Sequence, residues 1–589
     1  MCLFNAHAYE DVATMGLGPY QYAVYDLGAS NLRFNLIRAV IDAYVAQISQ
    51  TKPKPRALTT DGNWTLKRKA EGLTRWWEGW AEDTELYRVT SQPCCRDSAV
   101  FNFGLAKVYR KYPERKDLWD VGVERTFPWE IFADDAEAQQ PTNLRTLGQR
   151  KWYDRTVLSE MFPSKRAAIM GYAPASGMMA QSYDLATNSV ADLVAVHELW
   201  RLPSYPGAKD GRRVICIEGD VLVDEVWERP RFPFAMLYRE QPSQGIWGVA
   251  IPHELRGMQV CINRTVTDAE DCMQLFGKPR MLAKVGSVQK EFLSDDHEDI
   301  IEWSGDVPPT VVTNAPFPPQ LWESVWTTWA KGFEQIGMNE QTARAALPEG
   351  LSGSGASIRA WDDVQSGRLY EASLNREDWH MKLAELAVDE AREIAKERPD
   401  FASAYRGKKY VQIVRFRDID PGKDRFYFKA WPESRLSKAP AQRLAQLQEL
   451  FNAQIIGPDE FRELLAFPDL ESEDNLVNAP REIAEKIIET MLDAKNTDDP
   501  ELLMYPEPEW PLEGPRGIMT RIQYAIVRAR LDGAPEKNVM LLQQFLRLCD
   551  AVLAKKAQMQ AAGQGPQPYP TPAPQPGQAP AQAPTPQAA

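Results

Sequence analysis

The sequence predicts an α+β protein that is mainly helical, with one small sheet and several modules. Three observations support this prediction: apolar residues recur at helical spacing along most of the chain, short β-rich runs replace that spacing between about 191 and 240, and residues 562–589 carry no charge. Because 589 residues exceed what one hydrophobic core accommodates, we expect several modules.

Apolar residues spaced three and four apart predict the long helices. The pattern covers five stretches, at 30–50, 63–82, 252–276, 320–337 and 358–396. Pro252 and Gly277 bracket the third stretch, at the positions that proline and glycine favour around a helix. We expect the first 180 residues to be mainly helical, with 98–109 as a further apolar packing element. A helical region is also expected over 440–561, with two helices joined at 532–535.

Two stretches have the composition of strands. Between 191 and 240, runs rich in Val, Ile and aromatic residues alternate with turn-forming segments, which predicts a small antiparallel sheet. Residues 411–431 predict a β-hairpin around Asp420-Pro421-Gly422 that rejoins this sheet. The last stretch, 562–589, consists of Gly, Gln, Pro, Ala, Thr and one Tyr, so we expect a disordered tail.

Charge and cysteine content restrict the class of protein. A formal net charge of -14 and a pI near 5.2 argue against a protein that holds nucleic acid by bulk cationic attraction. The seven cysteines show no repeated CxxC spacing, and their odd number indicates reduced thiols and a cytoplasmic compartment. We expect no membrane segment, because no stretch approaches the ~18 apolar residues of a span, and no signal peptide at residues 1–25.

Catalytic motifs are scarce in this sequence. Its five histidines accompany no GxSxG, HExxH or Walker pattern, so we expect no enzyme activity, no cofactor and no metal. The nearest carboxylate cluster is Asp134, Asp135 and Glu137. A Mg²⁺-dependent nuclease that uses these acids is the alternative from the enzyme class, although a turn or a helix cap explains them without chemistry.

Five motifs in a fixed order resemble a known family. They are VERTFPWEIFADDAEA at 123–138, RKWYDRTVLSEMFP at 150–163, GVAIPHELRGMQVCINRT at 248–265, GLSGSGASIRAWDDVQSGRL at 350–369 and LFNAQIIGPDEFRELLAFPDLE at 450–471. Together they resemble the portal proteins, or head-to-tail connectors, of tailed bacteriophages, over most of the chain. None is a catalytic signature, so the resemblance depends on their order and joint presence.

The resemblance implies a structural protein with a wing, a stem, a clip and a crown. The small sheet would belong to the wing. The implied parts are an N-terminal arm (1–25), the first part of the wing (26–250), two stem helices (252–276 and 320–337), the clip (278–319), a channel loop (343–356), a long helix with returning wing strands (357–431), the helical crown (440–561) and the disordered tail (562–589).

The resemblance also implies an assembly and its partners. Portal subunits form a closed ring, usually a homododecamer, at one capsid vertex of the virion, and the ring conducts double-stranded DNA during packaging and ejection. The implied partners are the terminase large subunit, head-tail adaptor and tail proteins, and the major capsid and scaffolding proteins, first in the host cytoplasm. An acidic wall that repels phosphate suits such a conduit. Another phage ring or tail component, such as an adaptor or baseplate protein, remains the structural alternative.

The Gly-rich stretch at 343–356 is the candidate channel loop. Its glycines permit backbone conformations that other residues avoid, and its small side chains let several copies crowd around a duplex. A phosphate-binding loop is an alternative, but the Lys-Ser or Lys-Thr that would follow the glycines is missing; an exposed flexible linker is another. The residues expected to face DNA are Arg344, Leu347, Leu351, Ser352 and Ser354.

Charged and aromatic residues of the stem and the clip are the remaining candidates. The stem residues Arg256, Arg264 and Lys331 are candidates for weak phosphate contacts, with ion pairs to Glu254, Glu270 or Glu323 as the alternative. Neighbouring subunits of a ring would pair opposite charges of the clip, unless these charges are only a solvated surface or, around His297, a metal site. The clip set is Lys278, Arg280, Lys284, Lys290, Asp295, Asp296, Glu298 and Asp299.

An aromatic stripe lies on the predicted helix at 320–337. Such rings stack on bases in proteins that bind single strands. At this spacing they more often pack between helices, and we expect that role here. The stripe consists of Trp322, Trp326, Trp329 and Phe333.

Overall fold

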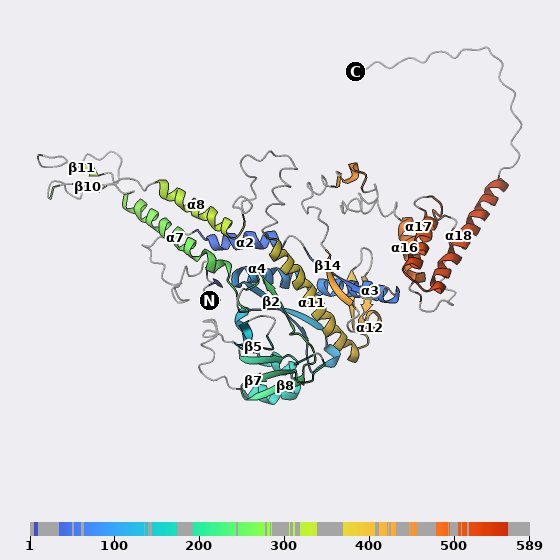
Figure 1. Cartoon of the computed structure of the whole chain (residues 1–589), viewed down its shortest axis with the longest axis horizontal. Helices are drawn as coiled ribbons and strands as arrows, with labels where there is room; N and C mark the ends of the chain where they lie inside the picture. The colour runs from blue at the N-terminus through green and yellow to red at the C-terminus, as the bar shows by residue number, and fades with distance from the viewer. Residues whose placement is uncertain are drawn as a thin grey trace, which may run out of the picture. The chain divides into compact units, whose positions relative to one another are not determined.

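A computed structural model of the chain has a mixed α+β architecture, mainly helical with small sheets, as the sequence predicts (Figure 1). The chain divides into two compact units, the first of residues 1–60 and 67–435, the second of residues 61–66 and 436–589. The structure describes residues 5–6, 8–9, 34–49, 52–59, 64–134, 136–139, 144–172, 192–205, 207–242, 245–276, 280–282, 284–285, 306, 310–312, 319–338, 369–406, 411–420, 422, 426–431, 447–448, 450–455, 479–492, 494, 505–507, 509–514 and 517–563.

Two antiparallel sheets form the centre of the first unit. One has the order β3-β2-β9, from Val121–Thr126, Phe103–Arg110 and Phe234–Tyr238. The other has the order β4-β5-β6-β7-β8, from Ile131–Ala133, Thr146–Asp154, Leu193–Arg201, Arg212–Ile217 and Asp220–Val226. The antiparallel sheet predicted between 191 and 240 is therefore confirmed, although β9 pairs with β2 instead of joining it.

Helices predominate in the described part of the first 180 residues, as predicted, but strands, including β2 to β5, also form there. The stretch 98–109 divides at Asn102, whose φ of 72° ends α4 (Gln92–Phe101) before β2 begins. Asparagine tolerates this left-handed conformation better than most residues. Strand β2 is buried on both faces along most of its length, and a continuous apolar run of this kind cannot be distinguished from a buried helix by its periodicity.

The long helices lie close to their predicted positions. Those of the predicted stretches are α2 (Leu36–Ile48), α3 (Trp64–Asp83), α7 (Ile251–Phe276), α8 (Pro319–Gln335) and α11 (Tyr370–Glu397), and residues 358–368 lie outside the described residues. The chain also forms α5 (Arg155–Met161), α6 (Arg166–Gly171), α12 (Phe416–Ile419), the π-helix η2 (Leu86–Ser91) and the 3₁₀ turns Lys116–Leu118, Pro128–Glu130, Glu137–Gln139 and Pro163–Lys165.

The returning strands do not form the hairpin predicted around Asp420-Pro421-Gly422. Strand β13 (Val411–Arg415) pairs with β12 (Ala402–Arg406), and β14 (Phe426–Trp431) pairs with β1 (Lys54–Thr59). The strands therefore do not rejoin the sheet of 191–240 either. Helix α12 separates β13 from β14, and the carboxylate of Asp420 accepts hydrogen bonds from Arg392 of α11 at 3.1 Å instead of closing a two-strand turn.

Helix α11 contributes a large share of the first unit's core. Its buried face packs against β9 and β2, and the indole N–H of Trp379 donates to the carbonyl oxygen of Ala235 at 3.0 Å. The fully buried Trp76 of α3 meets Phe416 of α12 edge to face, with ring centroids 5.1 Å apart. Burying aromatic rings of this size contributes strongly to folding.

The described part of the second unit includes the helices α16 (Ala479–Leu492), α17 (Ile518–Leu531) and α18 (Glu536–Gly563). Their shared core includes Ile487, Ile522 and Phe545. The predicted junction at 532–535 is confirmed, and Gly533 adopts a φ of 75° there. Helix α18 continues through Gly563, so the first two residues of the predicted tail are helical; residues 564–589 lie outside the described residues.

Candidate functional site

Helices α7 and α8 form an antiparallel pair within the first unit (Figure 1). The start of α7 lies beside the end of α8, where the side-chain amide of Gln335 donates to the carbonyl oxygen of Glu254 at 3.5 Å. Between the two helices, the chain forms a short antiparallel pair of strands, β10 (Arg280–Leu282) and β11 (Thr310–Val312). The predicted helix, insert and helix therefore follow one another in the structure.

An apolar seam joins the two helices to the core of the first unit. Leu255, Ile262 and Val266 of α7 are buried, as are Val325 and Phe333 of α8. These positions recur every three or four residues, as expected for the inner faces of amphipathic helices. The seam is continuous with the core that contains α2 and α11.

The aromatic stripe of α8 is mainly a packing surface, as the sequence predicts. Phe333 is buried, and Trp322 and Trp329 are half-buried against the core. Trp326 is the most exposed member, with 46% of its surface accessible, and its ring lies 5.7 Å from that of Phe34.

Gln259 of α7 attaches the helix pair to α2. Its side-chain oxygen accepts hydrogen bonds from the backbone N–H groups of Leu36 at 2.8 Å and Ile37 at 3.3 Å. Its amide nitrogen donates to the carbonyl oxygen of Phe34 at 2.7 Å. The N–H groups of a helix's first turn have no partner within the helix. A buried side chain of α7 therefore satisfies the start of α2 and fixes the two helices against each other.

Gly332 brings α8 into close contact with the same helix. A Cβ atom at this position would lie 2.6 Å from a methyl carbon of Leu36, which is fully buried. Only a glycine allows this approach without displacing Leu36. Helix α2 is therefore held by α7 through hydrogen bonds and by α8 through close packing.

Arg239, which follows β9, fixes the first turn of α7. Its buried guanidinium forms an ion pair with Glu254 and also donates to the carbonyl oxygen of Val249 at 3.3 Å. Burial raises the pKa of the Glu254 carboxyl above its ordinary value, although Arg239 opposes that shift. Asn102 holds the same loop by donating to the carbonyl oxygen of Trp247 at 3.3 Å. The helix pair thus begins from a segment with several buried polar contacts.

The predicted basic residues of the stem all lie on the solvent-exposed side of the pair. Arg256 and Arg264 are exposed on α7, and Lys331 is exposed on α8. Lys331 forms an ion pair with Glu334 at 3.7 Å, one turn along its own helix, and not with Glu323. Exposed ion pairs of this kind contribute little stability. The side chains of Arg256, Arg264 and Lys331 therefore remain accessible to a ligand.

Most residues of the predicted channel loop and clip lie outside the described residues. This holds for the whole channel-loop set, Arg344, Leu347, Leu351, Ser352 and Ser354, and for Lys278, Lys290, Asp295, Asp296, Glu298 and Asp299 of the clip. Of the other clip residues, Arg280 lies on β10 and Lys284 is exposed.

The carboxylates of the nuclease alternative are engaged by backbone groups. Asp134 accepts hydrogen bonds from the N–H groups of Ala136 at 2.9 Å and Glu137 at 3.3 Å. The carboxylate of Glu137 accepts from the N–H of Thr146 at 2.7 Å. Asp135 lies outside the described residues. These contacts agree with the turn interpretation of Asp134.

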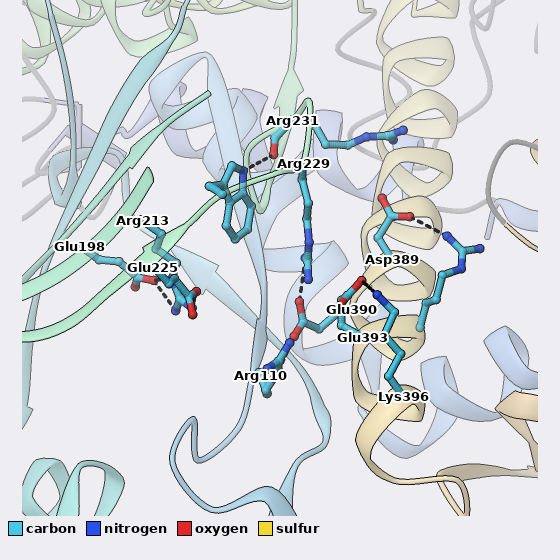
Figure 2. A network of polar contacts seen from close by, with 12 residues as sticks. Arg110, Glu198, Arg213, Glu225, Arg229, Arg231, Asp389, Glu390, Glu393 and Lys396 are labelled. Carbon is cyan, nitrogen blue, oxygen red and sulfur yellow. Dashed lines mark hydrogen bonds and ion pairs between the residues drawn. The ribbon is translucent and has the colours of Figure 1, made fainter. Parts of the chain in front are cut away.

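Sequence reasoning missed a network of buried ions between α11 and the sheets (Figure 2). Glu390 of α11 lies between Arg110 of β2 and Arg229, each at 2.7 Å. Burial alone would raise the pKa of Glu390, but the two guanidinium groups outweigh it and hold that pKa below its ordinary value. No sequence motif indicates this network, because its members lie far apart along the chain.

A second buried cluster lies between the two larger sheets. Glu198 of β6 pairs with Lys107 of β2 and with Arg213 of β7, and Arg213 also pairs with Glu225. The pKa of Glu198 is lowered because these cations outweigh the effect of its burial. Both clusters join elements that are distant in sequence. We therefore assign them a structural role.

No protein-family model matches this chain, and no curated protein matches it either. Within the described part of the chain, no group of three or more His, Cys, Asp or Glu side chains is placed to hold a metal ion, and no helix is long and apolar enough to cross a membrane. What the described residues offer is a firmly held helix pair with exposed cations.

Proposed function

We propose that this chain is a portal subunit of a tailed bacteriophage, a non-enzymatic member of a closed ring through which DNA enters and leaves the capsid. The observation that carries the proposal is the α7–α8 pair: two long helices joined by an insert, with both open ends attached to one mixed α/β unit. The same order of parts underlies the sequence resemblance to portal proteins.

The attachment of the pair suits a part that guides a moving polymer. Gln259 and Arg239 are both buried, and salt screens the ion pair of Arg239 with Glu254 less than it screens surface ion pairs. A force along α7 would pass directly into α2 and β9 through these two residues. A stem that lines a channel needs such a firm base, because a loose helix pair would yield to the DNA.

The charge distribution favours passage over retention. Arg256 and Arg264 are exposed and able to make transient contacts with phosphates. The formal net charge of -14 on each subunit opposes strong adhesion of DNA, because repulsion between like charges accumulates around a ring. We therefore assign the exposed arginines a guiding role.

The proposal includes partners that act in sequence. The insert between α7 and α8 would bind the terminase large subunit during packaging, and adaptor and tail proteins would replace it afterwards. Major capsid and scaffolding proteins would surround the ring at the vertex, after assembly in the host cytoplasm. The terminase supplies the energy, and this chain supplies the path.

Mass and symmetry of the purified protein test the proposal. Light scattering and negative-stain microscopy should give a ring of about twelve copies with a central hole. A monomer that cleaves DNA with Mg²⁺, and loses this activity as the Asp134→Ala variant, would sink the proposal in favour of a nuclease. A ring that does not bind the terminase large subunit would point to an adaptor or baseplate protein.

A further inference from the structure

A cavity of about 240 Å³ lies in the first unit, at some distance in sequence from the α7–α8 pair. Its lining comes from β2 and β3 of one sheet, β5, β6 and β7 of the other, and helix α5. Alternate residues of each strand share a face, so the sheets contribute Lys107 with Tyr109, Val196 with Glu198, and Arg213 with Ile215. The cavity is partly open to solvent and is not used by the proposed channel.

Two tyrosines give the cavity its hydrogen-bonding capacity. Tyr109 and Tyr153 both line it, and neither hydroxyl has a hydrogen-bond partner among the residues that the structure describes. Burial, reinforced by Glu124, raises the pKa of Tyr109 to about 12, and burial also raises that of Tyr153. Both phenols therefore remain neutral and able to donate. Both tyrosines are half-buried, and neither hydroxyl is among the fully buried polar atoms, so a ligand in the cavity can reach both.

The charged side chains around the cavity are already paired. Lys107 and Arg213 share Glu198, and Glu124 pairs with Lys151 at 2.5 Å. On the rim, Arg110 and Lys111 pair with other carboxylates of the unit, Glu390 and Asp120. A charged ligand would have to break one of these pairs, whereas a neutral ligand leaves them intact.

The size of the cavity limits what it accepts. Pockets for drug-sized ligands and cofactors measure about 300–1,000 Å³, so this one is too small for a nucleotide or a dinucleotide. The rest of its wall is largely apolar, from residues such as Leu158, Met161, Phe162 and Val196. An aromatic ring fits such a wall, since its faces pack against apolar and aromatic side chains.

We propose that this cavity binds one neutral aromatic ring that carries a hydrogen-bonding group, with Tyr109 and Tyr153 recognising that group. Phenols and indoles have this chemistry. The ring comes either from a free small molecule or from a Tyr or Trp side chain of another polypeptide. This inference does not depend on the portal proposal.

Binding of p-cresol and toluene to the full-length protein tests the inference, by ligand-observed NMR titration. The two molecules differ only in the hydroxyl. We expect p-cresol to bind with a Kd below about 1 mM, and the Tyr153→Phe variant to weaken it by roughly threefold to tenfold, the effect of one hydrogen bond. Toluene binding should not change in that variant. Tyr205→Phe, an exposed tyrosine outside the cavity, is the matched control and should alter neither titration.

A second variant separates occupation of the cavity from binding elsewhere. Val157 lines the mouth and is 52% exposed, so Val157→Trp should block the cavity without disturbing the core. It should abolish binding of both probes. A tighter Kd for an N-acetylated, C-amidated Tyr dipeptide than for p-cresol would assign the ring to a polypeptide, and a weaker one to a free molecule. Absence of p-cresol binding, or binding that survives Val157→Trp, would overturn the inference.

Discussion

In the first unit, charged side chains reach into the core and pair there, whereas the described core of the second unit is apolar apart from Asn538. Lys107, Glu198 and Glu390 of the first unit are all less than a tenth exposed. The partners of Glu390 lie on other elements, hundreds of positions away in the case of Arg110. Helices α16, α17 and α18 of the second unit follow one another in the sequence and pack mainly through apolar side chains.

The two cores have different numbers of alternative arrangements to exclude. Three helices that follow one another in the sequence have few alternative arrangements, so apolar faces largely define their packing. Two sheets and a long helix have many alternative pairings. A buried ion pair often adds little net stability, because its desolvation opposes its attraction, but it strongly disfavours any arrangement that leaves one charge unpaired. We infer that the buried ions of the first unit select its arrangement more than they stabilise it.

The largest expected effect comes from removing the central carboxylate of the network. Glu390→Gln leaves Arg110 and Arg229 close together without a counter-charge. We expect the free energy of unfolding of the first unit to fall by about 3–5 kcal/mol, and that of the second unit to stay unchanged. Hydrogen exchange read by mass spectrometry reports each unit separately.

Glu393→Gln is the matched control for this variant, because it removes an exposed carboxylate of the same helix. Glu393 pairs with Lys396 at 2.8 Å, and both side chains are at least 40% exposed. We expect a loss of no more than about 1 kcal/mol. Similar losses in Glu390→Gln and Glu393→Gln would show that the buried carboxylate of the network matters no more for stability than an exposed one.

Acidification should destabilise the first unit more than the second unit, because the first unit contains a buried histidine. His380 of α11 is fully buried: its Nδ1–H donates to the carbonyl oxygen of Arg376 at 2.8 Å, and Nε2 lies 3.0 Å from the hydroxyl of Ser91. Burial, together with the charge of Arg376, lowers the pKa of His380 from 6.5 to about 3. All five histidines belong to the first unit.

Stability falls on acidification because the unfolded chain binds a proton at His380 more readily than the folded chain does. Below about pH 6.5 the unfolded chain protonates His380, whereas the folded chain does not until about pH 3. The first unit should therefore lose about 2 kcal/mol of stability between pH 6.5 and pH 5. His380→Gln should reduce this slope, with a remainder from His197, whose pKa burial also lowers. A second unit that loses as much over this range would contradict the assignment.

A smaller effect is expected from Asn538, the buried polar residue among the described residues of the second unit. The side-chain amide of Asn538 donates to the carbonyl oxygens of Leu492, the last residue of α16, at 2.9 Å and of Ala494 at 3.1 Å. Asn538→Ala should lower the free energy of unfolding of this unit by about 1–2 kcal/mol, as measured in urea. Thr490→Ala, which removes an exposed hydroxyl of α16, should cost no more than about 0.5 kcal/mol.

The smallest effects test how α8 approaches α2. Gly332→Ala adds a methyl group that must displace the buried Leu36, so we expect a net loss of about 1 kcal/mol despite the better helix propensity of alanine. Gly257→Ala on α7 meets no neighbouring atom within 4 Å and should raise stability by about 0.5–1 kcal/mol. Opposite shifts in Tm are expected. Two increases of equal size would refute close packing between α8 and α2.

The features of the fold that could be predicted from the sequence are those with local signals. Helical spacing is a local signal, so α7, α8 and the junction of α17 with α18 could be located from residues a few positions apart. The pairing of β14 with β1 depends on strands at opposite ends of the first unit, and no local pattern specifies it. The turn residues at 420–422 suggested a hairpin because their sequence is typical of one, but Asp420 pairs with Arg392.

The same reasoning applies to the candidate site. The spacing of the apolar residues located the two helices that carry Arg256, Arg264 and Lys331, and the structure shows these three residues exposed. It gave no indication of Gln259, because a glutamine within a helical pattern has no signal that separates a buried hydrogen-bonding role from an exposed one. The ions of the first unit were missed for a related reason: a pair is visible only when both partners are near in sequence.

A three-dimensional reconstruction of the purified assembly by electron microscopy, at a resolution that shows helices, would locate the α7–α8 pairs in the assembly. We expect a ring in which the α7–α8 pairs line the central hole, with Arg256 and Arg264 accessible from it. A ring with the α7–α8 pairs on its outer rim, or a closed particle without a hole, would contradict the assignment of this pair as the wall of a DNA channel.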